Sequence, residues 1–107
     1  MTGDKTFVAL SSPIRRRILA YLSKTTLSSS EIAERFDMTK PSISKHLGIL
    51  ENAGLVTFEK KGQFVYYSLA RENLVANLHD FLTVICPESR VYRKESAAIA
   101  RSKKEVK

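Results

Sequence analysis

Hydrophobic residues in the first half of the chain recur three or four positions apart, which is typical of helices. An apolar segment at residues 7–10 leads into a predicted helix that begins at Pro13 and ends near residue 24. Ser12 is a good N-cap, and Pro13 suits the first helical position because its missing N–H would be unpaired there. The periodicity places three consecutive basic residues largely on the outer face of this helix: Arg15, Arg16 and Arg17.

Two further helices are predicted downstream. Ser28 and Glu31 have the spacing of a capping box, in which each side chain accepts the backbone N–H of the other, and about two helical turns follow. Thr39 then caps the next helix, which tolerates Pro41 in its first turn and ends at Gly54. The sequence therefore predicts two helices that are joined by a short turn.

Beyond Gly54 the apolar period changes from 3.6 to 2. Residues 55–60 and 63–69 are rich in β-branched and aromatic residues and predict two strands, and Gly62 between them is typical of a β-hairpin. Two helices that are joined by a short turn and followed at once by a two-stranded ribbon form a winged helix-turn-helix. The predicted fold class is mainly α with a small β-hairpin.

A last helix is predicted from about Glu72 to Ile85, ended by Pro87. So wide an apolar face at the end of a small domain favours contact with a partner subunit, although packing on its own core is the alternative. We expect a domain over 1–87 and a basic tail over 88–107, helical or disordered. The apolar stripe consists of Leu74, Val75, Leu78, Phe81, Leu82 and Ile85.

The charge balance points to a polyanionic partner. The chain has 107 residues, with 18 Lys or Arg against 11 Asp or Glu and a net charge of +7. Nucleic acid is the first partner to consider and a membrane surface the second. The last 21 residues hold 7 Lys or Arg against 3 Asp or Glu, a net charge of +4, which leaves +3 for residues 1–86. The total charge is therefore weaker evidence than the position of individual cations.

Other protein classes are disfavoured. No apolar run approaches the roughly 18 residues of a membrane-spanning helix, and the N-terminus lacks a signal-peptide pattern, so we expect a cytoplasmic protein without membrane insertion. We do not expect an enzyme, because the chain has no Gly-rich phosphate loop and no recognisable catalytic triad. Cys86 is the single cysteine and cannot form an internal disulfide. An inert thiol is the simpler interpretation, and an intersubunit disulfide or a reactive thiol is left open.

The helix after Thr39 carries the candidate DNA contacts. On a helical wheel its large apolar residues face the core, and the other side presents short hydroxyls and Lys45. Serine can pair with base edges or phosphate, and lysine can reach O6 and N7 of guanine. His46 lies at the margin of the core stripe, where a ring bonded to backbone or phosphate, a base contact, and a pH or metal role are the alternatives. The hairpin tip adds Lys60 and Lys61, which suit phosphates or a minor groove.

These motifs, in this order over residues 7–86, resemble the ArsR family of bacterial repressors. The Lys-Pro-Ser-Ile-Ser and Gly-Gln-Phe-Val-Tyr-Tyr-Ser-Leu segments look closest to its SdpR-like branch of autorepressors, which has no metal ligands. The resemblance implies a homodimer that pairs through its first and last helices, binds a palindromic double-stranded DNA operator and represses transcription. With the hairpin tip, the predicted DNA-binding residues are Lys40, Ser42, Ser44, Lys45, His46, Lys60, Lys61 and Gln63.

The family's metal ligands do not match this chain. Where the metal-sensing branch has a Cys-x-Cys pair, residues 28–30 are all serine. A second type of site uses Asp and His pairs on the last helix, but His79 and Asp80 are adjacent and so point about 100° apart. We therefore expect neither a metal nor another cofactor. The alternatives are a metal- or thiol-responsive sensor with a non-standard intersubunit site, and a winged-helix module that binds protein or RNA.

Overall fold

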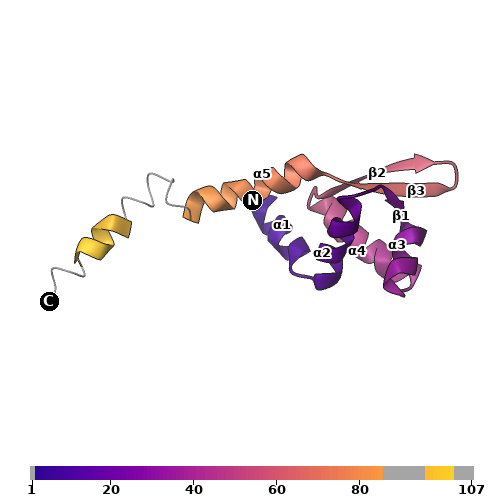
Figure 1. The fold of residues 1–107 in the computed structure, drawn as a ribbon, viewed down its shortest axis with the longest axis horizontal. Coiled ribbons are helices and arrows are strands. Elements are labelled where there is room, and N and C mark those ends of the chain that lie inside the picture. Colours follow the sequence, from indigo (N-terminus) through magenta and orange to yellow (C-terminus); the bar gives the residue numbers. More distant parts are fainter. Residues whose placement is uncertain (1, 86–95, 103–107) are drawn as a thin grey trace. The chain divides into compact units, whose positions relative to one another are not determined.

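The structure is a computed structural model, and it describes residues 2–85 and 96–102 (Figure 1). The chain forms two compact units, Met1–Asn77 and Leu78–Lys107. Residues 96–102, within the predicted tail, are helical, while Cys86 and Pro87 lie outside the described residues. The predicted domain boundary at residue 87 stays a prediction. The labelled elements are α1 (Thr2–Leu10), α2 (Pro13–Leu22), β1 (Leu27–Ser28), α3 (Ser29–Phe36), α4 (Lys40–Asn52), β2 (Val56–Lys61), β3 (Phe64–Leu69) and α5 (Arg71–Ile85).

The predicted helix caps are confirmed. The Ser12 hydroxyl accepts the N–H at the third residue of α2, with the donor and acceptor 3.3 Å apart. At α3, the Glu31 N–H donates to Ser28 Oγ over 3.2 Å, and the Ser28 N–H donates to Glu31 Oε1 over 2.9 Å, which completes the capping box. Thr39 caps α4. Asp37, with a φ of 50°, makes the left-handed turn between α3 and α4, and Gly54, with a φ of 74°, follows α4.

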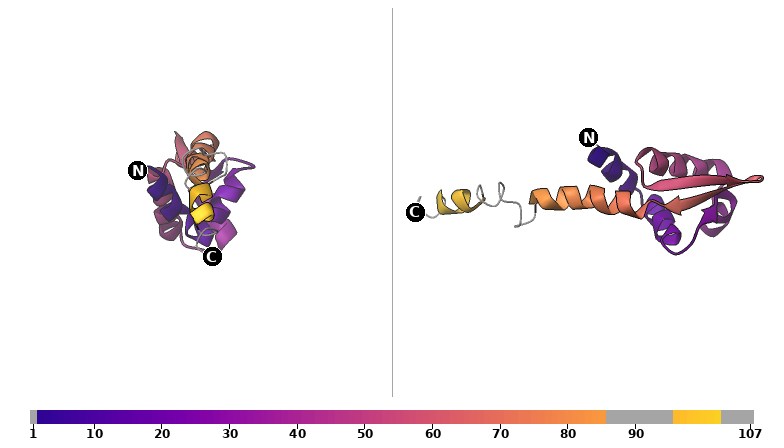
Figure 2. Two further views of the ribbon diagram at one scale, coloured as in Figure 1. Left: turned by 90° about the vertical axis from the view of Figure 1, so that its left-hand side faces the viewer. Right: turned by 90° about the horizontal axis from the view of Figure 1, so that it is seen from above.

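The predicted hairpin is confirmed, and one more strand joins it. β2 and β3 pair antiparallel from Val56 opposite Leu69 to Lys61 opposite Phe64. The two-residue strand β1 pairs with the other edge of β3, so that the order in the sheet is β1-β3-β2. Strand β1 was not predicted, because two residues carry no periodic signal. Figures 1 and 2 show the hairpin extending past the helices, with its tip at the edge of the unit.

The core lies among α2, α3, α4 and the start of the sheet. The three residues of α4 that the helical wheel placed inside, Ile43, Leu47 and Leu50, are fully buried. They share the core with Ile18 of α2, Ile32 of α3 and Leu55, which follows α4. This arrangement fixes one face of α4 against the domain and leaves the opposite face at the surface.

Two expectations about the N-terminal segment were wrong. The apolar residues before Ser12 do not simply lead into α2 but end a separate helix, α1. Arg15, which we expected on the exposed face of α2, is only 9% exposed. Its guanidinium donates to two carbonyl oxygens at the end of α1, from Nε to Ala9 over 2.8 Å and from Nη2 to Val8 over 3.1 Å. Those carbonyls have no partner within the helix, and five N–H donors let arginine be buried there.

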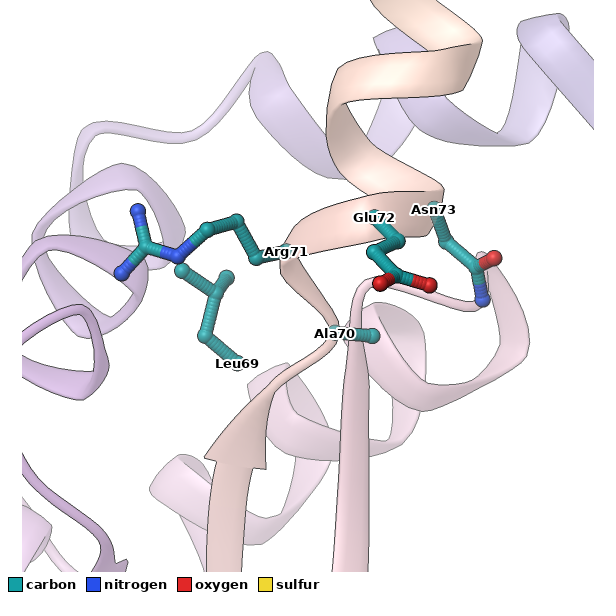
Figure 3. Close-up of a pocket in the computed structure, with 5 residues that line it drawn as sticks. All are labelled: Leu69, Ala70, Arg71, Glu72 and Asn73. Atoms are coloured by element: carbon teal, nitrogen blue, oxygen red, sulfur yellow. The ribbon is translucent and has the colours of Figure 1, made fainter.

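The first part of α5 is held to the domain by polar side chains. Arg71 donates to the Ser23 carbonyl over 3.1 Å, and the Asn73 amide donates to the Gly54 carbonyl over the same distance. Asn77 donates to the hydroxyl of Thr6, 2.8 Å away. Figure 3 shows the junction of β3 and α5, where a hollow of about 370 Å³ is lined by Leu69, Ala70, Arg71, Glu72 and Asn73. The Arg71 side chain extends away from Glu72 and Asn73 (Figure 3).

Candidate nucleic-acid interface

The outward face of α4 is polar. Lys40, Ser44 and Lys45 are exposed, and Ser42 is half-buried beside the start of the helix. Lys45 lies opposite the buried face of α4 and Ser42 and Ser44 lie on its flanks, as the helical wheel predicted. A helix with lysines and short hydroxyls on its exposed face can enter a major groove and come close to base edges and phosphates.

The first turn of α4 orients one of these hydroxyls. The Ser42 N–H donates to Thr39 Oγ1 over 3.3 Å, and the same Thr39 hydroxyl donates to Ser42 Oγ over 2.9 Å. Because Ser42 Oγ accepts this bond, the proton of its own hydroxyl remains available for an acceptor outside the chain. A phosphate oxygen or a base-edge acceptor fits this donor.

Gly48 opens the middle of the same face. No atom of the described residues outside the local helix backbone lies within 4 Å of the position that a Cβ would occupy. Glycine inside a helix costs about 0.5–1 kcal/mol relative to alanine, and no packing within the described part of the chain requires it here. The missing side chain leaves the helix backbone accessible to a surface that approaches from outside.

His46 contacts a side chain that the sequence did not indicate. The ring is half-buried, and its Nδ1 lies 3.1 Å from Nη1 of Arg15 on α2. Burial lowers the pKa of His46 below the usual 6.5, and the positive charges of Arg15 and Lys45 lower it further. The sequence left three alternatives open for this ring, one of which was a bond to backbone or phosphate. The structure shows a bond to Arg15 in place of a bond to backbone.

The hairpin tip presents the second group of predicted residues. Lys60, Lys61 and Gln63 are all exposed around Gly62, whose φ of 62° makes the turn. Because successive side chains of a strand point to opposite faces, the two lysines lie on different sides of the ribbon. Lys61 lines a shallow polar hollow of about 450 Å³ on one sheet face together with Thr26, Glu59, Tyr66 and Ser68.

The remaining arginines of α2 have contacts within the domain. Arg16 Nη1 donates to the carbonyl of Leu10 over 2.6 Å. The guanidinium carbon of Arg17 lies 4.7 Å from the centroid of the Phe36 ring on α3, which is the distance of a cation–π contact. Both side chains are exposed. The sequence left phosphate contact and a solvated helix face open for these residues, and the structure adds a role in joining α2 to its neighbours.

Candidate metal ligands do not come together in the described part of the chain. No three His, Cys, Asp or Glu side chains there lie close enough to hold a metal ion. The serines that replace the Cys-x-Cys pair form the capped start of α3, and His79 and Asp80 are exposed on α5. Among the described helices, none has the length and apolar character needed to cross a membrane.

Comparisons with known proteins agree with this geometry. Residues 10–57 match a family model described as a helix-turn-helix domain. The chain is 47% identical to the transcriptional repressor SdpR of Bacillus subtilis over 66 residues. This matched region covers 62% of this chain and 73% of SdpR. It is 36% identical over 66 residues to the repressor SmtB of Mycobacterium tuberculosis, covering 62% of this chain and 49% of SmtB.

Solved structures extend the match beyond the helix-turn-helix. An ArsR-like transcriptional regulator from Rhodococcus sp. RHA1 superposes with a TM-score of 0.78 and 30% identity, over 94% of this chain and 91% of that one. The resemblance inferred from the sequence motifs is thus confirmed by both kinds of comparison. This chain belongs to the ArsR family of winged helix-turn-helix transcriptional repressors.

Proposed function

We propose that the chain is a sequence-specific repressor that binds a palindromic double-stranded DNA operator as a homodimer in the cytoplasm. One observation carries the proposal: α4 buries Ile43, Leu47 and Leu50 while its other face presents hydroxyls, lysines and the open position at Gly48. A face of this kind suits a base-paired groove, because its side chains can donate to bases and phosphates without keeping the helix backbone away.

The contacts are divided between reading and positioning. Lys45, exposed near the middle of α4, is assigned to a guanine edge, and Ser44 to a base or phosphate. Lys40, at the start of α4, and Lys60, Lys61 and Gln63, at the hairpin tip, are assigned to the DNA backbone. This division predicts that α4 determines sequence preference and that the hairpin tip adds affinity.

The homodimer is supported by apolar side chains at the surface of α5 and α1. Val75, Leu82 and Ile85 on α5 are 59%, 47% and 60% exposed, and Val8 on α1 is 62% exposed. Exposed apolar side chains on a helix support an interaction surface, and a second copy of the same chain would bury them symmetrically. Two-fold pairing would place two α4 helices one turn of DNA apart, about 34–36 Å, or a multiple of it, which is why a palindrome is the expected target.

The dimer can be tested with a charge on the stripe. We expect Leu82→Asp to sediment as a monomer, because a carboxylate would be desolvated at the interface. Ala76→Asp introduces the same charge on an exposed position of the same helix outside the stripe, and it should remain a dimer. A dimeric Leu82→Asp protein would place the interface elsewhere.

The target can be found by a genome-wide footprint of the full-length protein that includes its own promoter. We expect a small number of palindromic sites, one of them upstream of its own gene if it is an autorepressor. The Leu82→Asp variant serves as a control that should lose these sites while keeping weak affinity for any duplex. Occupancy spread evenly over the genome would contradict a sequence-specific repressor.

A further inference from the structure

One buried guanidinium connects the end of α1 to α4. Arg15 donates from Nε and Nη2 to the carbonyls of Ala9 and Val8, and its Nη1 lies 3.1 Å from His46 Nδ1. With 9% of its surface exposed, Arg15 is held from three sides. The position of the His46 ring is therefore determined by an arginine that is itself fixed in place.

This contact determines which nitrogen of His46 carries the proton. An arginine side chain can only donate hydrogen bonds, so His46 Nδ1 must accept. In a neutral imidazole the other nitrogen then carries the hydrogen, which makes Nε2–H a donor. Protonation of Nδ1 would break the bond and would place a second positive charge beside Arg15, so the geometry favours the neutral ring.

The Nε2–H group is not fully buried. Within the described residues, every buried side-chain nitrogen or oxygen has a hydrogen-bond partner, and the hydrogen bond of His46 in that part of the chain is the one to Arg15. Nε2 is therefore not buried. His46 follows Ser42 by four residues, so the two side chains are neighbours on the surface of α4. The free hydroxyl proton of Ser42 and the Nε2–H of His46 thus form a pair of neutral donors along one edge of the helix.

We propose that Arg15 is a positioning residue that holds His46 as a neutral Nε2–H donor, and that this donor binds a DNA phosphate oxygen beside the Ser42 hydroxyl. The assignment rests on the proposed function as a DNA-binding repressor. Both groups can donate to phosphate oxygens, which accept a large share of the hydrogen bonds between proteins and DNA. Because both are uncharged, they fix the register of α4 on the DNA without releasing a counterion.

The protonation state can be measured in the free protein by NMR of histidine-labelled protein, which has only two histidines. At neutral pH, we expect long-range nitrogen–proton correlations to show His46 with its proton on Nε2. In Arg15→Gln, which removes the charge beside the ring, the pKa of His46 should rise, and circular dichroism controls for the fold. A proton on Nδ1, or a doubly protonated ring, in the wild-type protein would overturn the proposal whether or not the variant folds.

DNA binding provides the second test, with two variants in which an amide side chain replaces the imidazole of His46. In His46→Asn the amide oxygen can still accept from Arg15, but the shorter side chain keeps its N–H close to the helix and away from the position of Nε2, whereas His46→Gln can place an N–H near that position. We expect His46→Asn to weaken operator binding about tenfold, as for loss of a hydrogen bond to a charged group, and His46→Gln to recover part of that loss. The salt dependence should be the same for all three proteins.

These outcomes distinguish failure of the proposed function from failure of the role of His46. If wild-type protein prefers no duplex sequence, the proposed function fails. If the wild-type protein is specific but both the Asn and the Gln variant bind the operator as tightly as wild type, only the phosphate role of His46 fails. If His46→Asn lowers the slope of log affinity against log salt by about 0.9, His46 acts as a cation and the neutral-donor proposal is overturned.

Discussion

Thr39 Oγ1 and Ser42 Oγ lie 2.9 Å apart, and the Thr39 hydroxyl also accepts the Ser42 N–H. The residue that caps α4 therefore also orients a hydroxyl that we assign to DNA. The first turn of α4 thus contributes both to stability and, in our assignment, to DNA binding. Substitutions at Thr39 and Ser42 can separate these two effects.

Thr39→Ala should lower the free energy of unfolding by about 1 kcal/mol, because it leaves a helix N–H without its cap, while Thr39→Ser should retain most of the stability. Ser42→Ala keeps the backbone N–H that the cap binds, so its stability should stay within about 0.5 kcal/mol of wild type. Its operator affinity should nevertheless fall. Urea unfolding and operator titration measure the two effects, and unchanged affinity in Ser42→Ala would remove its hydroxyl from the interface.

Lys60 and Lys61 should act independently, because they lie on opposite faces of β2. Each substitution to alanine should reduce the slope of log affinity against log salt by about 0.9 if each lysine neutralises one phosphate, and the double variant should lose the sum. Lys24→Ala, in the exposed turn after α2, is the matched control and should leave the slope unchanged. A double variant with the wild-type slope would show that the hairpin tip does not touch the DNA backbone.

Gly48→Ala should have opposite effects on folding and binding. The free energy of unfolding should rise by about 0.5–1 kcal/mol, since alanine is the better helix former and the space around Gly48 is open. Operator affinity should fall, because the new methyl group lies on the face that approaches the DNA. Chemical denaturation and operator titration on the same preparation test this pair of signs. A more stable variant with undiminished affinity would mean that the DNA does not come close to this position.

The lowered pKa of His46 makes stability depend on pH. As pH falls below 6.5, the unfolded chain takes up a proton before the folded chain does, so the free energy of unfolding should decrease between 6.5 and the lower pKa of the folded state. Above 6.5 this contribution is fully present. The loss should be absent in His46→Gln, and the difference between the two denaturation profiles isolates this residue. Parallel profiles would contradict a histidine held neutral by burial and by Arg15.

Much of the fold could be predicted from local patterns. The caps at Ser12, Ser28 and Thr39 and the change of period after Gly54 placed α2, α3, α4 and the hairpin to within a residue or two. Helix α1 was not separated from α2, because the residues before Ser12 have no capping motif and only a few apolar positions. Strand β1 depends on pairing with β3, a long-range contact that no local pattern encodes.

The candidate site shows the same limit. The exposed positions of α4 follow from helical periodicity, because the buried face determines the opposite one. The contact between Arg15 and His46 spans 31 residues and was missed, since three consecutive arginines look alike in a sequence and only packing distinguishes the buried one. The position of His46 at the margin of the core stripe indicated a partly buried ring, but it did not identify Arg15 as the partner.

The central claim, that α4 reads DNA sequence, is tested most directly by a salt-controlled titration of the wild-type protein and of Lys45→Ala on the operator and on a scrambled duplex of equal length. We predict that the wild-type protein prefers the operator by at least about a thousandfold. Lys45→Ala should lower the difference in binding free energy between the two duplexes by about 1–3 kcal/mol while still binding both. Equal wild-type affinity for the two duplexes would contradict the account.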